Sequence, residues 1–227
     1  MLAAAAVIVF AYVLGSIPVA FLVARATKGV DIRAYGSGNV GASNIWQSVS
    51  KALVVPVGLA QIGQGLAGPG VAALLDMDEG VQVAAAVAAV LANDWNPWLG
   101  FTGGRGVGAT IGALIILSPP ALFAFIIISL AGVALRAIPQ GVGLALLSAP
   151  IVAAVAAAHV IVILGCALLA VIALVKRVLA NEAPAPDLER PAVYVNRLIY
   201  DRDIRDRDAW VRRGVRRTED DRAARAG

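Results

Sequence analysis

The sequence predicts an all-α membrane protein, a bundle of seven transmembrane helices with its N-terminus outside, its C-terminus in the cytoplasm and two glycine-rich cytoplasmic loops. Three observations support this fold class. Of the 227 residues, 59% are hydrophobic and only 15% are charged, well below the quarter that is usual in soluble domains. Apolar runs of helix-spanning length recur through the first 175 residues. The cations of that region are confined to alternate loops.

The expected helices follow from the apolar runs and from the residues that interrupt them. Residues 2–24 carry no charge and have about the 20 residues needed to cross a bilayer. This run is longer than the apolar core of a signal peptide and lacks a basic leading region, so we interpret it as a retained first helix. Near its middle, Ser16 and Pro18 either kink the helix or line a polar cavity. The later spans are expected at about 52–75, 81–92, up to 117, 121–135, 141–157 and 160–175.

The charge of the connecting loops predicts the orientation. Cations occur in every second loop: Arg25 to Lys51, Arg105, Arg136, and Lys176 with Arg177. The intervening loops are acidic or uncharged, so the positive-inside rule places the cationic loops in the cytoplasm. Trp95 and Trp98 are typical of the aromatic belt at a membrane interface. His159, between the last two spans, is then expected at the outer interface.

Two glycine-dense polar segments interrupt the apolar sequence on the predicted cytoplasmic side. The first glycine loop reads DIRAYGSGNVGASN at 31–44, and the second reads NDWNPWLGFTGGRGVGAT at 93–110. Glycine permits unusual backbone conformations and leaves backbone N–H groups open to a ligand. Each loop is expected to run directly into an apolar helix, whose dipole favours an anion such as phosphate.

The first glycine loop allows two other interpretations. Residues 36–41 fit the dinucleotide pattern Gly-x-Gly-x-x-Gly, but no βαβ unit surrounds them. A flexible connection between closely packed helices is a second alternative. Serine and asparagine side chains among the glycines favour a binding site, because a flexible connection does not require them.

The sequence after about residue 178 differs from the rest. We expect a transmembrane domain at 1–178 and a charged cytoplasmic tail at 179–227, with prolines marking a linker at 184–191. Acids and bases alternate from Arg197 to Arg225, which predicts either a solvated helix or a disordered chain. The tail arginines are also suited to anionic lipid headgroups. Cys166 is the only cysteine, which excludes an internal disulfide, and we expect it to be an inert helix residue.

Three segments resemble the signatures of one family. GSIP at 15–18, the first glycine loop and GFTGGRGVGAT at 100–110 are similar to those of the bacterial integral-membrane glycerol-3-phosphate acyltransferases that use acyl phosphate. The resemblance implies a seven-helix bundle in the bacterial cell membrane. It also implies acyl transfer from acyl phosphate to the 1-hydroxyl of glycerol 3-phosphate, giving lysophosphatidic acid. The implied partners are these two substrates and membrane lipids, without a nucleic acid, cofactor or metal.

The same resemblance implies the site residues. Ser37 and Arg105 are the expected catalytic residues, with Arg105 in a position where the family usually has lysine. Acyl phosphate carries a good leaving group, so the protein mainly has to align two substrates and neutralise charge. An Asp31–Arg33 ion pair that only fixes the loop is an equal alternative for Arg33. The expected substrate-binding residues are Arg33, Gly36, Gly38, Asn39, Gly41, Ser43, Asn44, Asn93, Gly103, Gly104 and Gly106.

The sequence also departs from the family pattern. Several of the family's charged or histidine positions are occupied by neutral residues, and its serine loop is replaced by Pro139-Gln140-Gly141. Its C-terminal histidine and asparagine segment is matched only faintly, by Asn196-Arg197-Leu198. These departures favour an alternative function, a catalytically impaired paralogue that binds lipid or phosphate or acts on another acceptor. The replaced positions are Gln47 for arginine, Asn93 for histidine, Thr102 for lysine, and Gln61 and Gln64 for aspartate and lysine.

Overall fold

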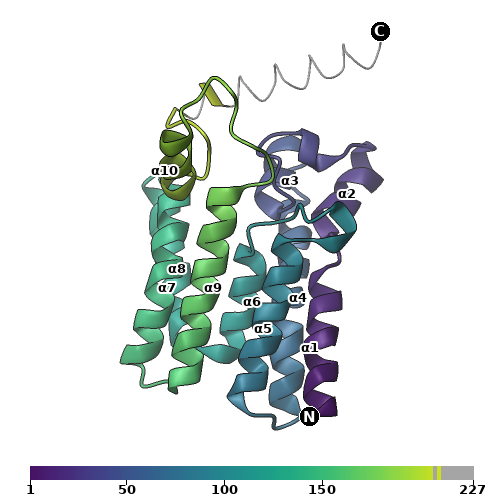
Figure 1. The fold of residues 1–227 in the computed structure, drawn as a ribbon, viewed down its shortest axis with the longest axis vertical. Coiled ribbons are helices and arrows are strands. Elements are labelled where there is room, and N and C mark those ends of the chain that lie inside the picture. The colour runs from purple at the N-terminus through teal and green to yellow at the C-terminus, as the bar shows by residue number, and fades with distance from the viewer. Residues whose placement is uncertain (207–208, 211–227) are drawn as a thin grey trace.

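The computed structural model describes residues 1–206 and 209–210, and over these residues the chain forms helices and no strand. The long helices run side by side and form the body of the molecule (Figure 1). This agrees with the all-α prediction. The long helices are α1 (Leu2–Gly15), α4 (Val54–Leu74), α5 (Glu79–Asp94), α6 (Val107–Leu117), α7 (Pro119–Ala134), α8 (Ile138–Val155) and α9 (Val160–Leu179).

Shorter helices gather at one end of the bundle, opposite the N-terminus (Figure 1). They are α2 (Val19–Lys28), α3 (Ala42–Ser48) and α10 (Arg190–Tyr200), together with the 3-10 turns η1 (Ile32–Ala34) and η2 (Pro97–Leu99). Within the bundle, α1 packs on α5 and α4, α4 on α6, and α7 on α8, while α9 packs on α8 and α5. The long helices α4 to α9 begin and end within a few residues of the expected spans. Both glycine loops lie at the end that carries the short helices.

Three helical stretches among the described residues are long and apolar enough to cross a bilayer: Leu2–Lys28, Ile138–Val155 and Val160–Leu179. Two shorter helices, α6 and α7, are also apolar. The exposed side chains of the bundle include many large apolar residues, such as Phe123, Leu144 and Leu164. An apolar exterior of this kind is suited to lipid rather than to water. The molecule therefore has the character of a membrane protein.

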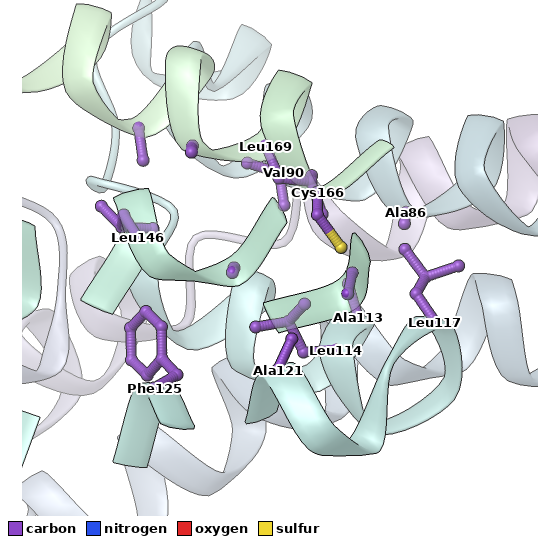
Figure 2. Packing of buried hydrophobic residues seen from close by; sticks show 14 of the residues in the cluster. Ala86, Val90, Ala113, Leu114, Leu117, Ala121, Phe125, Leu146, Cys166 and Leu169 are labelled. Atoms are coloured by element: carbon purple, nitrogen blue, oxygen red, sulfur yellow. The ribbon is translucent and has the colours of Figure 1, made fainter. Parts of the chain in front are cut away.

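The largest buried cluster lies between α5, α6, α7, α8 and α9 (Figure 2). Phe125, Leu146 and Leu114 fill its interior, and alanines make up much of the rest. Small residues let membrane helices approach closely and gain dispersion contacts. Cys166 lies in this cluster and is buried, which confirms its expected place as a small apolar helix residue.

The first expected span, 2–24, is not one continuous helix. It divides into α1 and α2, and the break falls at the expected position between Ser16 and Pro18. Proline lacks a backbone N–H and clashes with the preceding turn, which explains the break. Ser16 and Pro18 thus interrupt the helix, which was one of the two alternatives expected for them. Neither residue lines the cavity described below.

Side chains from two other segments add hydrogen bonds to backbone carbonyls at this break. Gln64 Nε2 donates to the carbonyls of Leu14 and Ile17, each at 2.8 Å. Asn96 Nδ2 donates to the carbonyl of Ser16 at 2.6 Å. Unpaired buried carbonyls are costly. Gln64 is therefore a structural residue in this chain.

Two further expectations need correction. The segment 25–51, expected as a loop, contains the end of α2, η1 and α3. The first glycine loop accordingly leads into α3, which has seven residues, and not directly into an apolar span. In the tail, α10 begins at Arg190, before the expected charged helix, and ends at Tyr200. The expected tail from residue 211 onward lies outside the described residues.

His159 lies where the sequence predicts, at the end of the bundle away from the glycine loops. It precedes α9, and its Nδ1 is 2.8 Å from Glu79 Oε2 at the start of α5. The imidazole is 79% exposed.

Candidate functional site

A cavity of about 760 Å³ lies between the glycine loops and the ends of α4, α6 and α8. One part of its lining is polar. The other part is apolar and is formed by side chains of α3, α4, α6 and α8. A cavity with a few convergent polar groups above an apolar wall is typical of a ligand site. The polar lining includes Ser37, Asn39, Ser43, Gln47, Asn93, Arg105, Arg136 and Arg177, and the apolar lining includes Trp46, Val54, Ile62, Val107, Ile111, Ile138 and Val142.

The first glycine loop is built around the side chain of Asn44, which is fully buried. Its Nδ2 donates to the carbonyls of Ile32, Tyr35 and Asn39 at 2.9–3.1 Å. Its Oδ1 accepts from the backbone N–H of Ser37 at 3.3 Å. Asn44 therefore fixes the path of the loop, and by doing so it places Ser37 and Asn39 at the cavity.

Gly36 makes this arrangement possible. Its φ is +58°, a left-handed conformation in which side chains are strained. A Cβ added to Gly36 would also overlap Asn44 Oδ1. Gly36 is therefore required so that the loop can pack closely against Asn44. The sequence predicts a different role for the loop glycines, which is to leave backbone N–H groups open to a ligand.

Gln61 attaches the first glycine loop to α4. Its Nε2 donates to the Val40 carbonyl at 3.3 Å, and its Oε1 accepts from the Ala42 N–H at 3.2 Å. Gln61 also lines the cavity. A neutral amide, which both donates and accepts, suits this double contact with the backbone.

The second glycine loop folds back onto the end of α5. The Gly104 N–H donates to the Asn93 carbonyl at 2.9 Å. Added Cβ atoms at Gly103 and Gly104 would overlap atoms of Asn93. Gly106 precedes α6 with a φ of +62°, and a Cβ there would lie 2.9 Å from Asp94 Oδ2. These glycines thus permit close contact between the loop and α5.

Asn181, just beyond α9, joins the two glycine loops. Its Nδ2 donates to the carbonyls of Gly38 at 3.0 Å and Gly103 at 2.9 Å. The Gly103 N–H in turn donates to Asn181 Oδ1 at 3.2 Å. A direct backbone bond, from the Val40 N–H to the Gly103 carbonyl at 3.2 Å, adds to this connection. The loops therefore form one continuous wall.

Arg33 makes a second connection between the loops. It forms an ion pair with Asp31 at 2.7 Å, and its Nη1 donates to Leu99 O and Thr102 Oγ1, each at 3.1 Å. The hydrogen bond from Arg33 lowers the pKa of Asp31 below its usual value. Thr102 occupies the position where the family usually has lysine. In this chain, Arg33 donates a hydrogen bond to its hydroxyl.

Two of the arginines that line the cavity, Arg105 and Arg177, are nearly buried. Arg105, from the second glycine loop, forms an ion pair with Asp201, which follows α10. Burial lowers the pKa of Arg105 to about 9, and repulsion by Arg177 and Arg197 adds to this effect. Arg177, near the end of α9, has its Nε 3.7 Å from Asp201 Oδ1. The cavity therefore contains two nearly buried guanidinium groups, which create a strong demand for an anion.

Comparison with known proteins identifies the family. The family model described as glycerol-3-phosphate acyltransferase matches residues 5–181. The chain belongs to this acyltransferase family.

Relatives and solved structures agree with the family model. Glycerol-3-phosphate acyltransferase 4 of Dehalococcoides mccartyi is 31% identical over 90% of this chain and 91% of the relative. A glycerol-3-phosphate acyltransferase of Desulforamulus reducens is 36% identical over 64% and 73%.

Crystal structures of the integral membrane glycerol 3-phosphate acyltransferase PlsY (YgiH) have the same fold. The glycerol 3-phosphate form is similar at a TM-score of 0.74, with 28% identity over 77% of this chain and 88% of the other. The lysophosphatidic acid form is similar at the same TM-score, with 27% identity over 92% and 98%.

The acyltransferase fold brings some of the expected site residues to the cavity and gives others a supporting place. Those that line the cavity are Ser37, Asn39, Gly41, Ser43, Asn93, Arg105 and Gly106. Those outside the lining, which shape or connect the two loops, are Arg33, Gly36, Gly38, Asn44, Gly103 and Gly104.

Four residues in or beside the candidate site were not among those expected from the sequence. Arg177 and Lys176 were interpreted only as markers of the cytoplasmic end of a span, and Asn181 and Asp201 only as tail residues. Lys176 is buried beside Trp95, with its Nζ 5.2 Å from the ring centroid. Asn196, the faint match to the family's asparagine, donates to the Asp203 carbonyl, away from the glycine loops. No local signal in the sequence identifies Asn181, because its partners Gly38 and Gly103 lie far from it in the chain.

Proposed function

We propose that this acyltransferase moves an acyl group from acyl phosphate to the 1-hydroxyl of glycerol 3-phosphate, giving lysophosphatidic acid and inorganic phosphate. The observation that carries the proposal is the junction of the two glycine loops above one cavity that holds Arg105. The names of the two PlsY structures give the acceptor and the product of this reaction.

The cavity has a suitable region for each part of the reaction. The side chain of Arg105 would hold a phosphate group, because charged hydrogen bonds to phosphate are strong and directional. Ser37 and Asn93 line the polar part, where the acceptor hydroxyl would meet the acyl carbon. The apolar wall, which includes Ile62 and Ile111, would take the acyl chain. The hydroxyl oxygen attacks the acyl carbon, the bond from this carbon to the phosphate oxygen breaks, and inorganic phosphate leaves with the hydroxyl proton released to it or to water.

This mechanism requires alignment more than chemical participation by the protein. Acyl phosphate already carries its leaving group, so no acyl-enzyme intermediate is needed. Holding two reactants in contact supplies a large part of the rate enhancement. Neutralising the charge on two phosphate groups supplies another part.

The proposed setting is the bacterial cell membrane. The chain would cross it seven times, through α1 with α2 and then through α4 to α9, with the N-terminus outside. Residues 1–178 would form the transmembrane domain, and residues 179–227 the cytoplasmic tail. The support for this orientation is the alternation of cationic loops, which places both glycine loops on the cytoplasmic face.

The decisive experiment is an assay of the purified full-length protein in detergent or nanodiscs, with palmitoyl phosphate and glycerol 3-phosphate. We expect lysophosphatidate from acyl phosphate and no product when palmitoyl-CoA replaces it. Replacing Arg105 with glutamine should lower kcat/KM by about a hundredfold or more, because a buried charge contact to the transferring group is lost. The matched control is Lys51→Gln, an exposed cation outside the cavity lining, which should retain activity.

The alternative, a paralogue that binds ligand without turnover, predicts a different result in the same assay. It would bind glycerol 3-phosphate or inorganic phosphate without forming lysophosphatidate from any chain length of acyl phosphate. That result would overturn the proposed function.

A further inference from the structure

Asp201 occupies an unusual position at the end of α10. It has a φ of +58°, a left-handed conformation that is uncommon outside glycine. Its backbone N–H closes the helix by donating to the Arg197 carbonyl at 3.0 Å. From this fixed backbone position, the carboxylate reaches Arg105 in the second glycine loop and Arg177 in α9. A segment beyond the matched family region, which ends at residue 181, therefore contributes a charge to the cavity.

The tail is anchored at a different place from the cavity. Arg197 is buried, and its Nε forms an ion pair with Asp203 Oδ1 at 2.6 Å. Its two terminal nitrogens donate to the carbonyls of Val178, Leu179 and Glu182 at 2.9–3.3 Å. These contacts hold α10 against the end of α9 without involving Asp201. The Asp201 side chain can thus change partners while the helix stays in place.

Arg177 is prepared to bind an anion. Its Nη1 donates to the carbonyls of Pro139 at 2.9 Å and Leu198 at 3.3 Å. Gly143 leaves room for it, since a Cβ there would lie 3.1 Å from Nη1. These carbonyls fix the guanidinium group but carry no net charge. The charge of Arg177, which is 5% exposed, therefore needs an anion from elsewhere.

We infer that Arg105 and Arg177 together form a phosphate-binding pair, and that Asp201 is an internal anion that occupies this pair until a substrate phosphate displaces it. This inference rests on the proposed function, and it identifies a further binding residue and a regulatory contact of the same site. Carboxylate and phosphate are both oxyanions and bind guanidinium groups in similar geometry. A phosphate dianion carries more charge than one carboxylate, so it competes well for two arginines.

The accessibility of the three side chains favours exchange over a permanent contact. Asp201 is 31% exposed, whereas Arg105 is 11% exposed. The carboxylate thus lies on the solvent side of the arginines, from which a water-soluble ligand arrives. Tyr200, Arg202 and Trp210 line the same cavity. Displacement of Asp201 would open this side of the cavity to glycerol 3-phosphate.

The first test compares Asp201→Asn with Glu189→Gln in the full-length protein. If the internal anion occupies the pair most of the time, removing its charge should lower the KM for glycerol 3-phosphate about three- to tenfold. The dissociation constant for inorganic phosphate should fall by a similar factor, with little change in kcat. Glu189→Gln removes an exposed tail carboxylate at the start of α10, outside the cavity lining, so it should leave both constants unchanged.

The second test needs no variant. Hydrogen exchange of the wild-type protein is followed over residues 198–206 with and without saturating inorganic phosphate. Ligands usually protect the segments they bind, but here phosphate should increase exchange in this segment because Asp201 loses its partners. It should decrease exchange in the second glycine loop.

These tests separate the inference from the proposed function. A wild-type protein that makes no lysophosphatidate overturns the proposed function, while the phosphate-binding and exchange results still decide the role of Asp201. Unchanged or weaker phosphate binding in Asp201→Asn would overturn the inference, as would equal effects of the two variants. Protection of residues 198–206 by phosphate would also overturn it, even if Asp201→Asn failed to fold.

Discussion

At the scale of single residues, two asparagine side chains hold the site together. Asn44 serves as the centre of the first glycine loop, and Asn181 bonds to both loops at once. A carboxamide can donate and accept at the same time, so one side chain completes the hydrogen bonding of several backbone groups. The loops also share apolar packing, since Ile32, Val40 and Leu99 belong to one buried cluster. The two amides add the polar contacts that set the path of the backbone in the loops.

Replacing Asn181 with alanine tests this dependence. The variant loses three hydrogen bonds, which is expected to cost about 2 kcal/mol. If the loops must stay aligned for catalysis, kcat/KM should fall about ten- to a hundredfold. The measurement is steady-state kinetics well below the melting temperature of the variant.

Asn196→Ala is the matched control for this prediction. Asn196 is also in the tail and donates one hydrogen bond, to the Asp203 carbonyl at 3.1 Å. We expect it to retain nearly full activity. Equal losses in the two variants would show that Asn181 has no special role in aligning the loops.

Part of the site could be predicted from residues alone, and the reason is local. Ser37, Asn39 and Arg105 stand in short, recognisable strings, and the structure places all three at the cavity. Arg177, Asn181 and Asp201 could not be assigned in this way, because their contacts join segments far apart in the sequence. The connection between Asn181 and Gly38, for example, spans 143 residues. Nothing near Asn181 in the sequence distinguishes it from an ordinary residue at the end of a helix.

At the scale of elements, the crossing of α4 and α6 positions the apolar wall of the cavity. A Cβ added at Gly65 in α4 would overlap the carbonyl of Ala109, and one at Gly112 in α6 would overlap the carbonyl of Ile62. The two backbones are therefore in direct contact. Small residues at a membrane helix crossing are stabilising because they permit this approach.

A pair of substitutions in one helix tests the crossing. Gly65→Ala forces α4 and α6 apart, and overpacking of this kind typically costs about 1–3 kcal/mol. Gly63→Ala is the control, since its added Cβ meets nothing within 4 Å. We expect the Tm of Gly65→Ala in detergent to fall by several degrees and that of Gly63→Ala to stay the same or rise slightly. Equal Tm values for the two variants would contradict a close crossing.

The helices themselves were largely predictable because charges and prolines separate the apolar runs. Asp76 to Glu79 divide α4 from α5, and Pro119 and Pro139 begin α7 and α8. The segment 25–51 was less predictable, since α3 is short and polar and gains its stability from contacts with α4 and α2. Periodicity does not identify such a helix.

At the scale of the whole molecule, the bundle brings distant segments to one end. The two glycine loops, the end of α9 and the start of the tail meet there (Figure 1). His159 and Glu79 lie at the other end. One end of the molecule thus carries the candidate site, and the other end carries short connections. The proposed orientation predicts that the end with the candidate site is cytoplasmic.

Cysteine labelling tests the central claim, that both glycine loops form one phosphate-binding site on the cytoplasmic face. In a Cys166→Ser background, single cysteines replace Gln47 beside the first loop, Val107 beside the second, or His159 at the opposite end. A membrane-impermeant maleimide is then applied to intact spheroplasts and to inside-out vesicles.

The account predicts that Gln47→Cys and Val107→Cys react only in inside-out vesicles, and that glycerol 3-phosphate protects both. His159→Cys should react only in spheroplasts and should not be protected. Labelling of the two loop positions from opposite sides of the membrane, or protection of one position without the other, would contradict a shared site.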